Sequence, residues 1–195
     1  MVFNEEQAYR MLANTIDAKR YIHSINVMHT AISLAMRYEY SLEEAKIAGL
    51  LHDCAKCFSN NQQITLCKDA QISISEYEKE YPDMLHAKLG AYLARKEYGI
   101  EKKEILDAIT FHITGRSDMG VLEKIVFVAD YIEPSRKNAP NLEHIRKLAF
   151  VDIDRAIYLI LKDTIAYVMK EKGSMDMASL ATYEFYENIQ KRTIL

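Results

Sequence analysis

The sequence predicts an all-α protein, and two features of its composition and patterning carry that prediction. Only six Gly and three Pro occur among 195 residues, so the residues that most often interrupt helices are scarce. The apolar residues recur mainly at spacings of three and four, which places them along one face of a helix. No segment shows the sustained alternation that is typical of a β-strand. We therefore expect helices along most of the chain.

The first expected helices lie on either side of a capping pattern. A helix is predicted over about residues 17–38, where apolar residues follow one face. Ser41 followed by Glu44 has the order of a capping box and predicts the start of a second helix, which should end near Lys56. The polar stretch 58–81 contains a Ser-Asn-Asn turn pattern, so we expect a surface segment with short helical turns.

Breaker residues bound the expected helices in the rest of the chain. Pro82 predicts the start of a helix, and Gly99 predicts its end as a left-handed cap. Further helices are expected over about 101–113, 122–132, 141–149, 152–172 and 180–190. No internal repeat or linker divides the chain. We therefore expect a single domain over 1–195, with a core of about 18–136 and C-terminal helices over about 141–192.

Charge and hydropathy narrow the classes of protein that fit this chain. The net charge of −3 leaves no excess of Lys and Arg for binding a nucleic acid polymer or an anionic membrane. No apolar stretch reaches the roughly 20 residues of a membrane-spanning helix, and the start lacks a signal-peptide pattern. A cytoplasmic protein is therefore expected. The three cysteines do not form a disulfide framework, and the Cys54–Cys57 pair lacks the second half of a structural zinc site.

Three residues indicate a site for a cation. His52 and Asp53 are adjacent and follow an apolar run. Neighbouring side chains on a helix point about 100° apart, so this pair is expected to meet a common external partner rather than each other. Asp130 lies among apolar residues, where a carboxylate without a partner would be costly to bury and a metal ion would offset that cost. The alternative is that Asp130 lies on the exposed side of an amphipathic helix.

Six candidate metal-ligating residues come from five expected helices. They are His23, His52, Asp53, His86, His112 and Asp130. Imidazole and carboxylate ligands suit iron, manganese, zinc or cobalt. A single histidine on a helix is more often a core or surface residue, so the order of the six carries the prediction. His29 and His144 fit the pattern less well and are expected at the surface.

This order of residues, H…HD…H…H…D, resembles that of the HD-domain metal-dependent phosphohydrolases. The longer motifs look like those of the YqeK family within that superfamily, whose members are symmetrical bis(5'-nucleosyl)-tetraphosphatases associated with iron. The matching motifs are Arg20-Tyr-Ile-His23, His52-Asp-Cys-Ala-Lys56, His112-Ile-Thr-Gly115 and Ala129-Asp-Tyr-Ile-Glu-Pro134 with Arg136. The resemblance implies an all-α HD-domain helical bundle.

The resemblance also implies a set of ligands and a cofactor. The metal ligands would be His23, His52, Asp53 and Asp130, and the remaining two histidines, His86 and His112, would hold a second metal or contact substrate phosphates. The implied metal is divalent iron, with manganese, cobalt and zinc as alternatives.

The implied reaction is hydrolysis of diadenosine tetraphosphate at its central anhydride, giving two ADP. Asp53 and Lys56 are the expected catalytic residues, with Asp53 orienting the attacking water. Arg20 and Arg136 are candidate donors to phosphate oxygens. Thr114-Gly115 would let the backbone approach a phosphate closely, although such turns are also common without a function.

Other functions stay open at this point. One alternative is another HD-type nucleotidase or phosphodiesterase; cyclic-dinucleotide phosphodiesterases usually carry a Gly-Tyr-Pro motif that is missing here. A second is an HD module that senses nucleotides without turnover, although such modules often lose a ligand and all six positions are filled here. The C-terminal helices carry several aromatic residues that are expected to cover the core, with a homodimer face as the alternative. These residues include Tyr158, Tyr167, Tyr183 and Tyr186.

Overall fold

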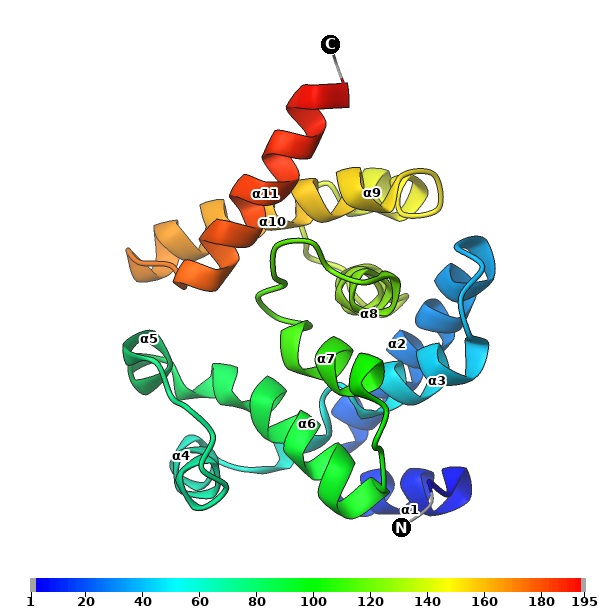
Figure 1. Ribbon diagram of the computed structural model, residues 1–195, viewed down its shortest axis with the longest axis vertical. Coiled ribbons are helices and arrows are strands. Elements are labelled where there is room, and N and C mark those ends of the chain that lie inside the picture. The colour runs from blue at the N-terminus through cyan, green and yellow to red at the C-terminus, as the bar shows by residue number, and fades with distance from the viewer. Residues whose placement is uncertain (1–2, 194–195) are drawn as a thin grey trace.

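The computed structural model describes residues 3–193, which form helices and contain no strand (Figure 1). The all-α prediction is therefore confirmed for the described part of the chain. The α-helices are α1 Glu5–Thr15, α2 Ala18–Arg37, α3 Leu42–Leu51, α4 Asn60–Asp69, α5 Glu76–Glu80, α6 Leu85–Tyr98, α7 Lys103–Phe111, α8 Val121–Ile132, α9 Leu142–Leu148, α10 Ile153–Lys172 and α11 Met177–Thr193. Two short 3₁₀ helices, η1 Cys54–Cys57 and η2 Pro82–Met84, join them.

Several helix ends follow from local sequence. The Asp17 side chain accepts from Arg20 N at the start of α2, and Ser41 accepts from Glu44 N at the start of α3. Gly99 ends α6 in the left-handed conformation with φ of 72°, which glycine adopts without a steric penalty. These boundaries agree with the sequence predictions.

The end of α3 differs from the prediction. The helix stops at Leu51 instead of continuing to Lys56, and a 3₁₀ turn follows. The His52 imidazole Nδ1 lies 2.8 Å from the Gly49 carbonyl oxygen. In a continuing helix that carbonyl would accept from the amide of Asp53. The histidine side chain takes this acceptor, and the backbone leaves the helix at the position where the site begins.

Two other segments are more helical than the sequence analysis expected. Residues 58–81 contain the ten-residue helix α4 as well as α5. Each begins with a capping box, Ser59 with Gln62 and Ser75 with Glu78, and this three-residue spacing is a readable start pattern. The N-terminal helix α1 was also not predicted; the Asn4 side chain caps it by accepting from Gln7 N.

Helix α8 occupies the middle of the molecule. It packs against α2, α3 and α7 on one side and against α9 and α10 on the other (Figure 1). Its side chains Ile125, Val126 and Val128 are fully buried, and α2 and α3 contribute further apolar residues to the same core. Burial all round this helix explains its almost continuous apolar sequence. Asp130 therefore projects from the most buried helix of the fold.

The C-terminal helices cover this core. Tyr186 of α11 is fully buried, and Tyr158 and Tyr183 stack with ring centroids 5.6 Å apart. These positions agree with the predicted covering role. Tyr167 of α10 differs because it is 62% exposed.

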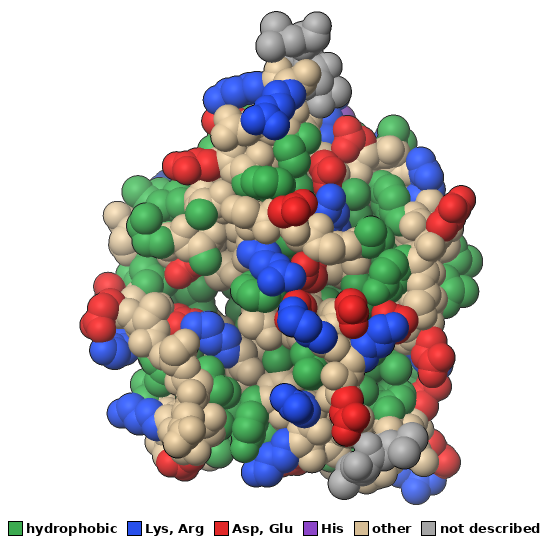
Figure 2. Space-filling model, in the orientation of Figure 1, with side chains coloured by type: hydrophobic (Ala, Val, Ile, Leu, Met, Phe, Trp, Pro, Cys, Tyr) green, Lys and Arg blue, Asp and Glu red, His purple; other side chains and the backbone are tan. Residues whose placement is uncertain are grey.

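The surface mixes charges of both signs. On the face that Figure 2 shows, basic and acidic side chains are interspersed, and the face is hollowed below the C-terminal helices. Among the described residues, no helix combines the length and apolar character needed to cross a membrane.

The close approach of α2 and α3 gives a stability prediction. A Cβ at Gly49 would lie 2.9 Å from the Met28 Cα, a backbone atom that cannot swing aside. Replacing Gly49 with Ala should therefore destabilise the fold by about 1–3 kcal/mol. Gly90 of α6 is a matched control, since a Cβ there would meet ordinary contacts of 3.4 Å or more. Gly90→Ala should be neutral or stabilising by up to about 1 kcal/mol.

Denaturant unfolding of the two variants checks this prediction. The two substitutions should shift the unfolding midpoint in opposite directions or by clearly different amounts. Equal midpoints for Gly49→Ala and the wild type would show that the helix pair is not in the tight contact described.

Candidate metal centre

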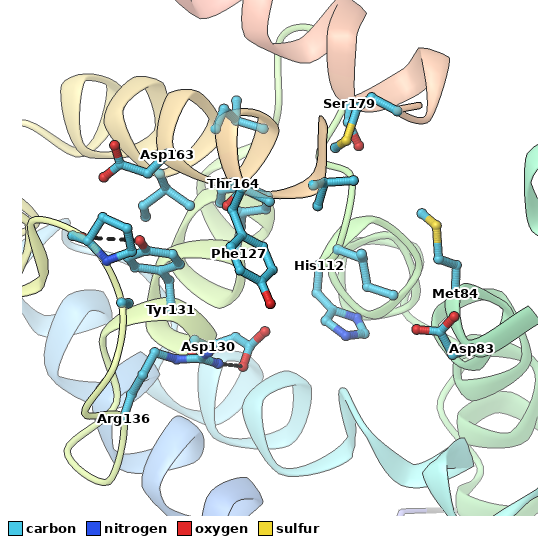
Figure 3. Close-up of a pocket in the computed structure, with 18 of the residues that line it drawn as sticks. Asp83, Met84, His112, Phe127, Asp130, Tyr131, Arg136, Asp163, Thr164 and Ser179 are labelled. Carbon is cyan, nitrogen blue, oxygen red and sulfur yellow. Dashed lines mark hydrogen bonds and ion pairs between the residues drawn. The ribbon is translucent and has the colours of Figure 1, made fainter. Parts of the chain in front are cut away.

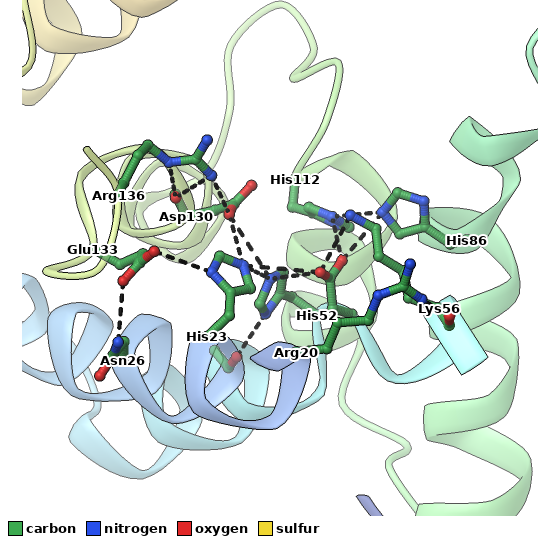
Figure 4. A network of polar contacts seen from close by, with 12 residues as sticks. Arg20, His23, Asn26, His52, Lys56, His86, His112, Asp130, Glu133 and Arg136 are labelled. Carbon is green, nitrogen blue, oxygen red and sulfur yellow. Dashed lines mark hydrogen bonds and ion pairs between the residues drawn. The ribbon is translucent and has the colours of Figure 1, made fainter. Parts of the chain in front are cut away.

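The six predicted ligands come together at the ends of helices (Figure 4). His23 lies in the second turn of α2, and Asp130 lies near the end of α8. His52 and His112 each follow the last residue of a helix, α3 and α7, and His86 lies at the start of α6. Asp53 follows His52 and precedes η1. Thus segments that are far apart in sequence meet at one point of the fold.

Four of these residues form a first cluster, which we call cluster A: His23, His52, Asp53 and Asp130. The His23 Nε2 atom is 3.1 Å from Asp130 Oδ1, 3.3 Å from His52 Nε2 and 3.8 Å from Asp53 Oδ2. The His52 Nε2 atom is 3.6 Å from Asp53 Oδ2 and 4.0 Å from Asp130 Oδ1. Ligand atoms at such separations can share one cation, since each would be about 2.0–2.2 Å from a metal between them.

The other two histidines form cluster B with the second oxygen of the same carboxylate. Asp53 Oδ1 is 3.2 Å from His86 Nε2 and 3.5 Å from His112 Nε2, and the two Nε2 atoms are 3.3 Å apart. The Asp53 carboxylate therefore belongs to both clusters, one oxygen to each. The sequence prediction grouped these six residues, but the bridging position of Asp53 is visible only in the structure.

Each histidine has its Nδ1 atom occupied by an oxygen acceptor. His52 Nδ1 donates to Gly49 O at 2.8 Å and His112 Nδ1 to Ile109 O at 2.7 Å, while His86 Nδ1 contacts the Asp83 carbonyl. His23 Nδ1 lies 3.3 Å from Glu133 Oε1. Because a carbonyl or carboxylate oxygen can only accept, Nδ1 carries the proton in each neutral imidazole. In the neutral form, all four imidazoles therefore turn an Nε2 lone pair toward the clusters. For His23, burial lowers the pKa, but Asp130, Asp53 and Glu133 raise it by more.

The facing lone pairs require a positive partner. In cluster B, two Nε2 atoms and a carboxylate oxygen converge, and the buried Asp53 Oδ1 has no hydrogen-bond donor in the described structure. Burial lowers the pKa of His52 to about 4, so this imidazole is neutral at pH 7. Burial also lowers the pKa of His86. A divalent cation fits this donor set, because histidine and carboxylate together bind such metals.

The two carboxylates of the site are ionised. Burial raises the pKa of Asp53, but His52, His112, His86 and Lys56 lower it by more, so it lies well below its usual range. Burial also raises the pKa of Asp130, but His23 and His52 lower it by more, so that pKa too lies below its usual range. The Asp130 side chain is 26% exposed, although its helix is buried. It faces an open cavity, so the site has both an enclosed and an accessible side.

Glu133 is a functional candidate that the sequence analysis did not assign. It is buried, and its carboxylate contacts His23 Nδ1 at 3.3 Å, Asn26 Nδ2 at 3.2 Å and both the amide and hydroxyl of Ser135. Burial raises the pKa of Glu133, but the hydrogen bonds from Ser135 and His23 lower it by more. The pKa is therefore below its usual range, and the carboxylate is ionised. A carboxylate on the outer nitrogen fixes the orientation of a metal-binding histidine and increases its basicity.

Lys56 and Arg20 lie beside the clusters. The Lys56 ammonium is 3.3 Å from Asp53 Oδ2, and its side chain is 35% exposed. The Arg20 guanidinium contacts the Lys56 carbonyl oxygen. Arg20 therefore holds the backbone of η1 in this structure, while Lys56 extends toward the site (Figure 4).

Arg136 is bound to Asp130 rather than free in solvent. Its guanidinium donates to the Asp130 carbonyl oxygen at 2.9 and 3.2 Å and to Asp130 Oδ1 at 3.2 Å. The side chain remains 35% exposed beside the cavity. Arg136 thus orients a predicted metal ligand and keeps part of its positive charge accessible.

Thr114 and Gly115 lie in the turn after α7 and do not line the main cavity, although the preceding residues His112 and Ile113 do. The Thr114 hydroxyl donates to the Gly115 carbonyl at 2.9 Å. Gly115 has φ of 61°, and a Cβ there would lie 2.8 Å from Thr182 Cγ2 of α11. The glycine permits close packing of this turn against the C-terminal helix, and a phosphate contact there remains a prediction.

A cavity of about 520 Å³ opens beside the clusters. Lys56, His86, His112, Asp130 and Arg136 form its polar wall. Figure 3 shows Asp130 and His112 facing Asp163 and Thr164 of α10 across this cavity, with Tyr131 at one side and Met84 at the other. The apolar lining comes from α8, α10 and the loop before α9, and includes Phe127, Tyr131, Pro140, Ile160, Leu161 and Val168. The cavity therefore has a polar end, lined by candidate metal ligands together with Lys56 and Arg136, and an apolar, aromatic end.

The contact between Glu133 and His23 gives a prediction on metal binding. Replacing Glu133 with Ala should weaken metal affinity about 10–100-fold, because His23 loses the partner that fixes its orientation. Competition against a chelating indicator dye, with Mn²⁺ as the probe, measures the affinity. Glu184→Ala, an exposed carboxylate of α11, is the control and should bind like the wild type. Unchanged affinity in Glu133→Ala would remove this residue from the metal centre.

Comparisons with known proteins agree with this geometry. The sequence model of the HD domain matches residues 20–135. A symmetrical bis(5'-nucleosyl)-tetraphosphatase from Halalkalibacterium halodurans is 41% identical over 92% of this chain and 95% of its own length. The protein of the same name from Bacillus subtilis is 36% identical, over 93% of this chain and 97% of its own.

A solved structure extends the likeness to the whole fold. The crystal structure of a predicted HD superfamily hydrolase involved in NAD metabolism, from Clostridium acetobutylicum, superposes with a TM-score of 0.93. It is 34% identical, and the match covers 97% of this chain and 100% of that one. The resemblance found in the sequence motifs is thereby confirmed. This chain belongs to the HD-domain family, and within that family it is close to the symmetrical bis(5'-nucleosyl)-tetraphosphatases.

Proposed function

We propose that this protein hydrolyses diadenosine tetraphosphate symmetrically to two ADP. The observation that carries the proposal is the cavity, which has the two histidine–aspartate clusters at one end and apolar, aromatic residues at the other. This arrangement suits a phosphate group attached to a nucleoside. Near-full-length relatives that bear the name of this activity support the same substrate.

The metal would be held by cluster A, with cluster B as a second metal site or a contact for phosphate. We expect divalent iron, with manganese, cobalt and zinc as alternatives, because imidazole and carboxylate ligands accept all four. When bound, such a cation lowers the pKa of a coordinated water toward about 7 and neutralises charge on phosphoryl oxygens. The residues of the chain supply the remaining functions.

Asp53 and Lys56 are the proposed catalytic residues. The Asp53 carboxylate is ionised and lies between the two clusters, where it can accept a hydrogen bond from the attacking water and orient it. The Lys56 ammonium, 3.3 Å from that carboxylate, is close enough to stabilise negative charge that develops on the phosphoryl group. No strong general acid is needed, because the departing ADP is already a stable anion.

Arginines and the cavity walls would bind the rest of the substrate. Arg136 has an accessible part of its guanidinium beside Asp130 and is a candidate donor to phosphate oxygens. Arg20 would act mainly by holding η1, on which Lys56 lies. The apolar end of the cavity would receive one nucleoside, with the base against aromatic side chains such as Tyr131 or Tyr167.

Product analysis separates this proposal from the two alternatives. The protein is incubated with diadenosine tetraphosphate and Fe²⁺ under anaerobic conditions, or with Mn²⁺, and the nucleotides are separated by chromatography. ADP as the sole product is the expected result. AMP with ATP, or free phosphate, would indicate another HD-type phosphohydrolase, and binding without turnover would indicate a nucleotide-sensing module.

The bridging carboxylate gives a prediction on turnover. Asp53→Asn keeps the size of the side chain but removes its charge, so kcat should fall by about 10²–10⁴-fold or more. Release of ADP over time measures the rate, and elemental analysis of the same samples measures the bound metal. Asp69→Asn on the exposed side of α4 is the control. A near-normal rate in Asp53→Asn would exclude this residue from catalysis.

The aromatic wall gives a prediction on substrate affinity. Tyr167 is 62% exposed yet lines the cavity, so its ring is available to a nucleobase. Tyr167→Ala should raise KM about 5–100-fold, as stacking on an aromatic ring contributes about 1–3 kcal/mol per base, and should leave kcat nearly unchanged. Met169→Ala, an exposed apolar residue of the same helix that does not line the cavity, is the control. A lower kcat at constant KM would contradict the stacking role.

A further inference from the structure

We propose that Arg146 of α9 is a positioning residue for the metal centre, because it fixes the backbone segment that carries Glu133 and Arg136. Its Nε donates to the Ile132 carbonyl at 3.0 Å. Its Nη2 donates to the carbonyls of Glu133 at 3.0 Å and Arg136 at 3.1 Å. One guanidinium therefore holds three backbone acceptors in a stretch of five residues.

The Glu133 carbonyl also accepts from Arg136 N at 3.1 Å, while the carbonyls of Ile132 and Arg136 accept from Arg146. Helix α8 ends at Ile132, and the last carbonyls of a helix have no partner within it. Pro134 follows and cannot supply an amide donor. The planar guanidinium offers several donors in a fixed arrangement, which a lysine ammonium cannot reproduce. Arg146 thus takes the place of the amides that a continuing helix would provide.

The side chains of Glu133 and Arg136, which belong to this segment, point toward His23 and Asp130 (Figure 4). Glu133 contacts His23 Nδ1 at 3.3 Å, and Arg136 contacts both the carbonyl and the carboxylate of Asp130. Two ligands of cluster A, one from α2 and one from α8, are therefore oriented by residues whose backbone Arg146 holds. Arg146 itself touches no predicted ligand in the described structure.

Arg146 lies on a helix that is packed against the core. Its neighbours Leu142 and Ile145 are buried and pack α9 against the rest of the fold. The side chain of Arg146 is only 28% exposed, and its remaining nitrogen, Nη1, pairs with Glu143 at 2.8 Å. Glu143 is 82% exposed, so this ion pair contributes little. The carbonyl contacts are the ones that matter for the site.

The test uses variants of the full chain and measures metal affinity and turnover. Arg146→Met keeps the bulk of the side chain but removes all hydrogen-bond donors. Arg146→Lys keeps the positive charge but lacks the planar arrangement of donors. Lys147→Met, an exposed cation on the same helix, and Glu143→Gln, which removes only the exposed partner, are the controls. Mn²⁺ affinity is measured by competition with an indicator dye, and the melting temperature is measured on metal-free protein.

Arg146→Met should bind Mn²⁺ about 10–100-fold more weakly and show a reduced kcat, while Arg146→Lys should recover only part of each. A third variant, Arg146→Ala, leaves a partly exposed space where the guanidinium was, and adding guanidinium ion should restore its metal affinity. Both controls should behave like the wild type. A lowered melting temperature with wild-type metal affinity and kcat, in either the Met or the Lys variant, would overturn the proposal and leave Arg146 a purely structural residue.

The kcat readout rests on the proposed function, but the metal readout does not. If the wild type releases no ADP from diadenosine tetraphosphate, the proposed function fails. The comparison of Mn²⁺ affinity between wild type and Arg146 variants still decides the role of Arg146.

Discussion

The arrangement of this site depends on four imidazole lone pairs that converge from four helices toward one carboxylate. Each Nδ1 atom is committed to an oxygen acceptor, so each Nε2 atom is left as an acceptor with no protein donor to meet it. Such an arrangement is unfavourable until a cation enters. Three of the four acceptors are carbonyls located three residues before the histidine. The local ends of the helices therefore fix the orientation of the ligands before any metal is bound.

Much of the fold could be predicted because the signals for it are local. The capping residues Asp17 and Ser41 and the left-handed Gly99 set helix boundaries that the structure reproduces. The missed helix α4 also had a local signal in Ser59 and Gln62, but its mixed polar composition concealed it. The early end of α3 had none, because it depends on the His52 side chain competing for a backbone carbonyl.

The residues that come together in the site could be predicted from the sequence, but the contacts among them could not. The order of six histidines and aspartates along the chain suggested a shared centre, and their side chains do lie together. Arg136 was expected to bind phosphate, but its main contacts here are with Asp130. The two residues are six positions apart, and the turn at Pro134 brings them together. Glu133 contacts His23, which lies 110 residues earlier in the chain, and Arg146 contacts carbonyls 10 to 14 residues before it. No spacing pattern in the sequence indicates such contacts.

The charges of the site explain why a polyphosphate would be its substrate. The carboxylates of Asp53 and Asp130 together carry two negative charges, and an imidazole that binds a metal through Nε2 adds no charge. One divalent cation would bring these ligands to neutrality, and a second in cluster B would leave an excess of two positive charges. The charges of Glu133 and Arg136 cancel, and Lys56 adds one positive charge next to Asp53. Asp83 and Asp163 place negative charge elsewhere on the cavity wall. A positive centre enclosed on one side and open to a cavity on the other attracts an anion with several phosphate groups, and the apolar wall selects one that carries a nucleoside.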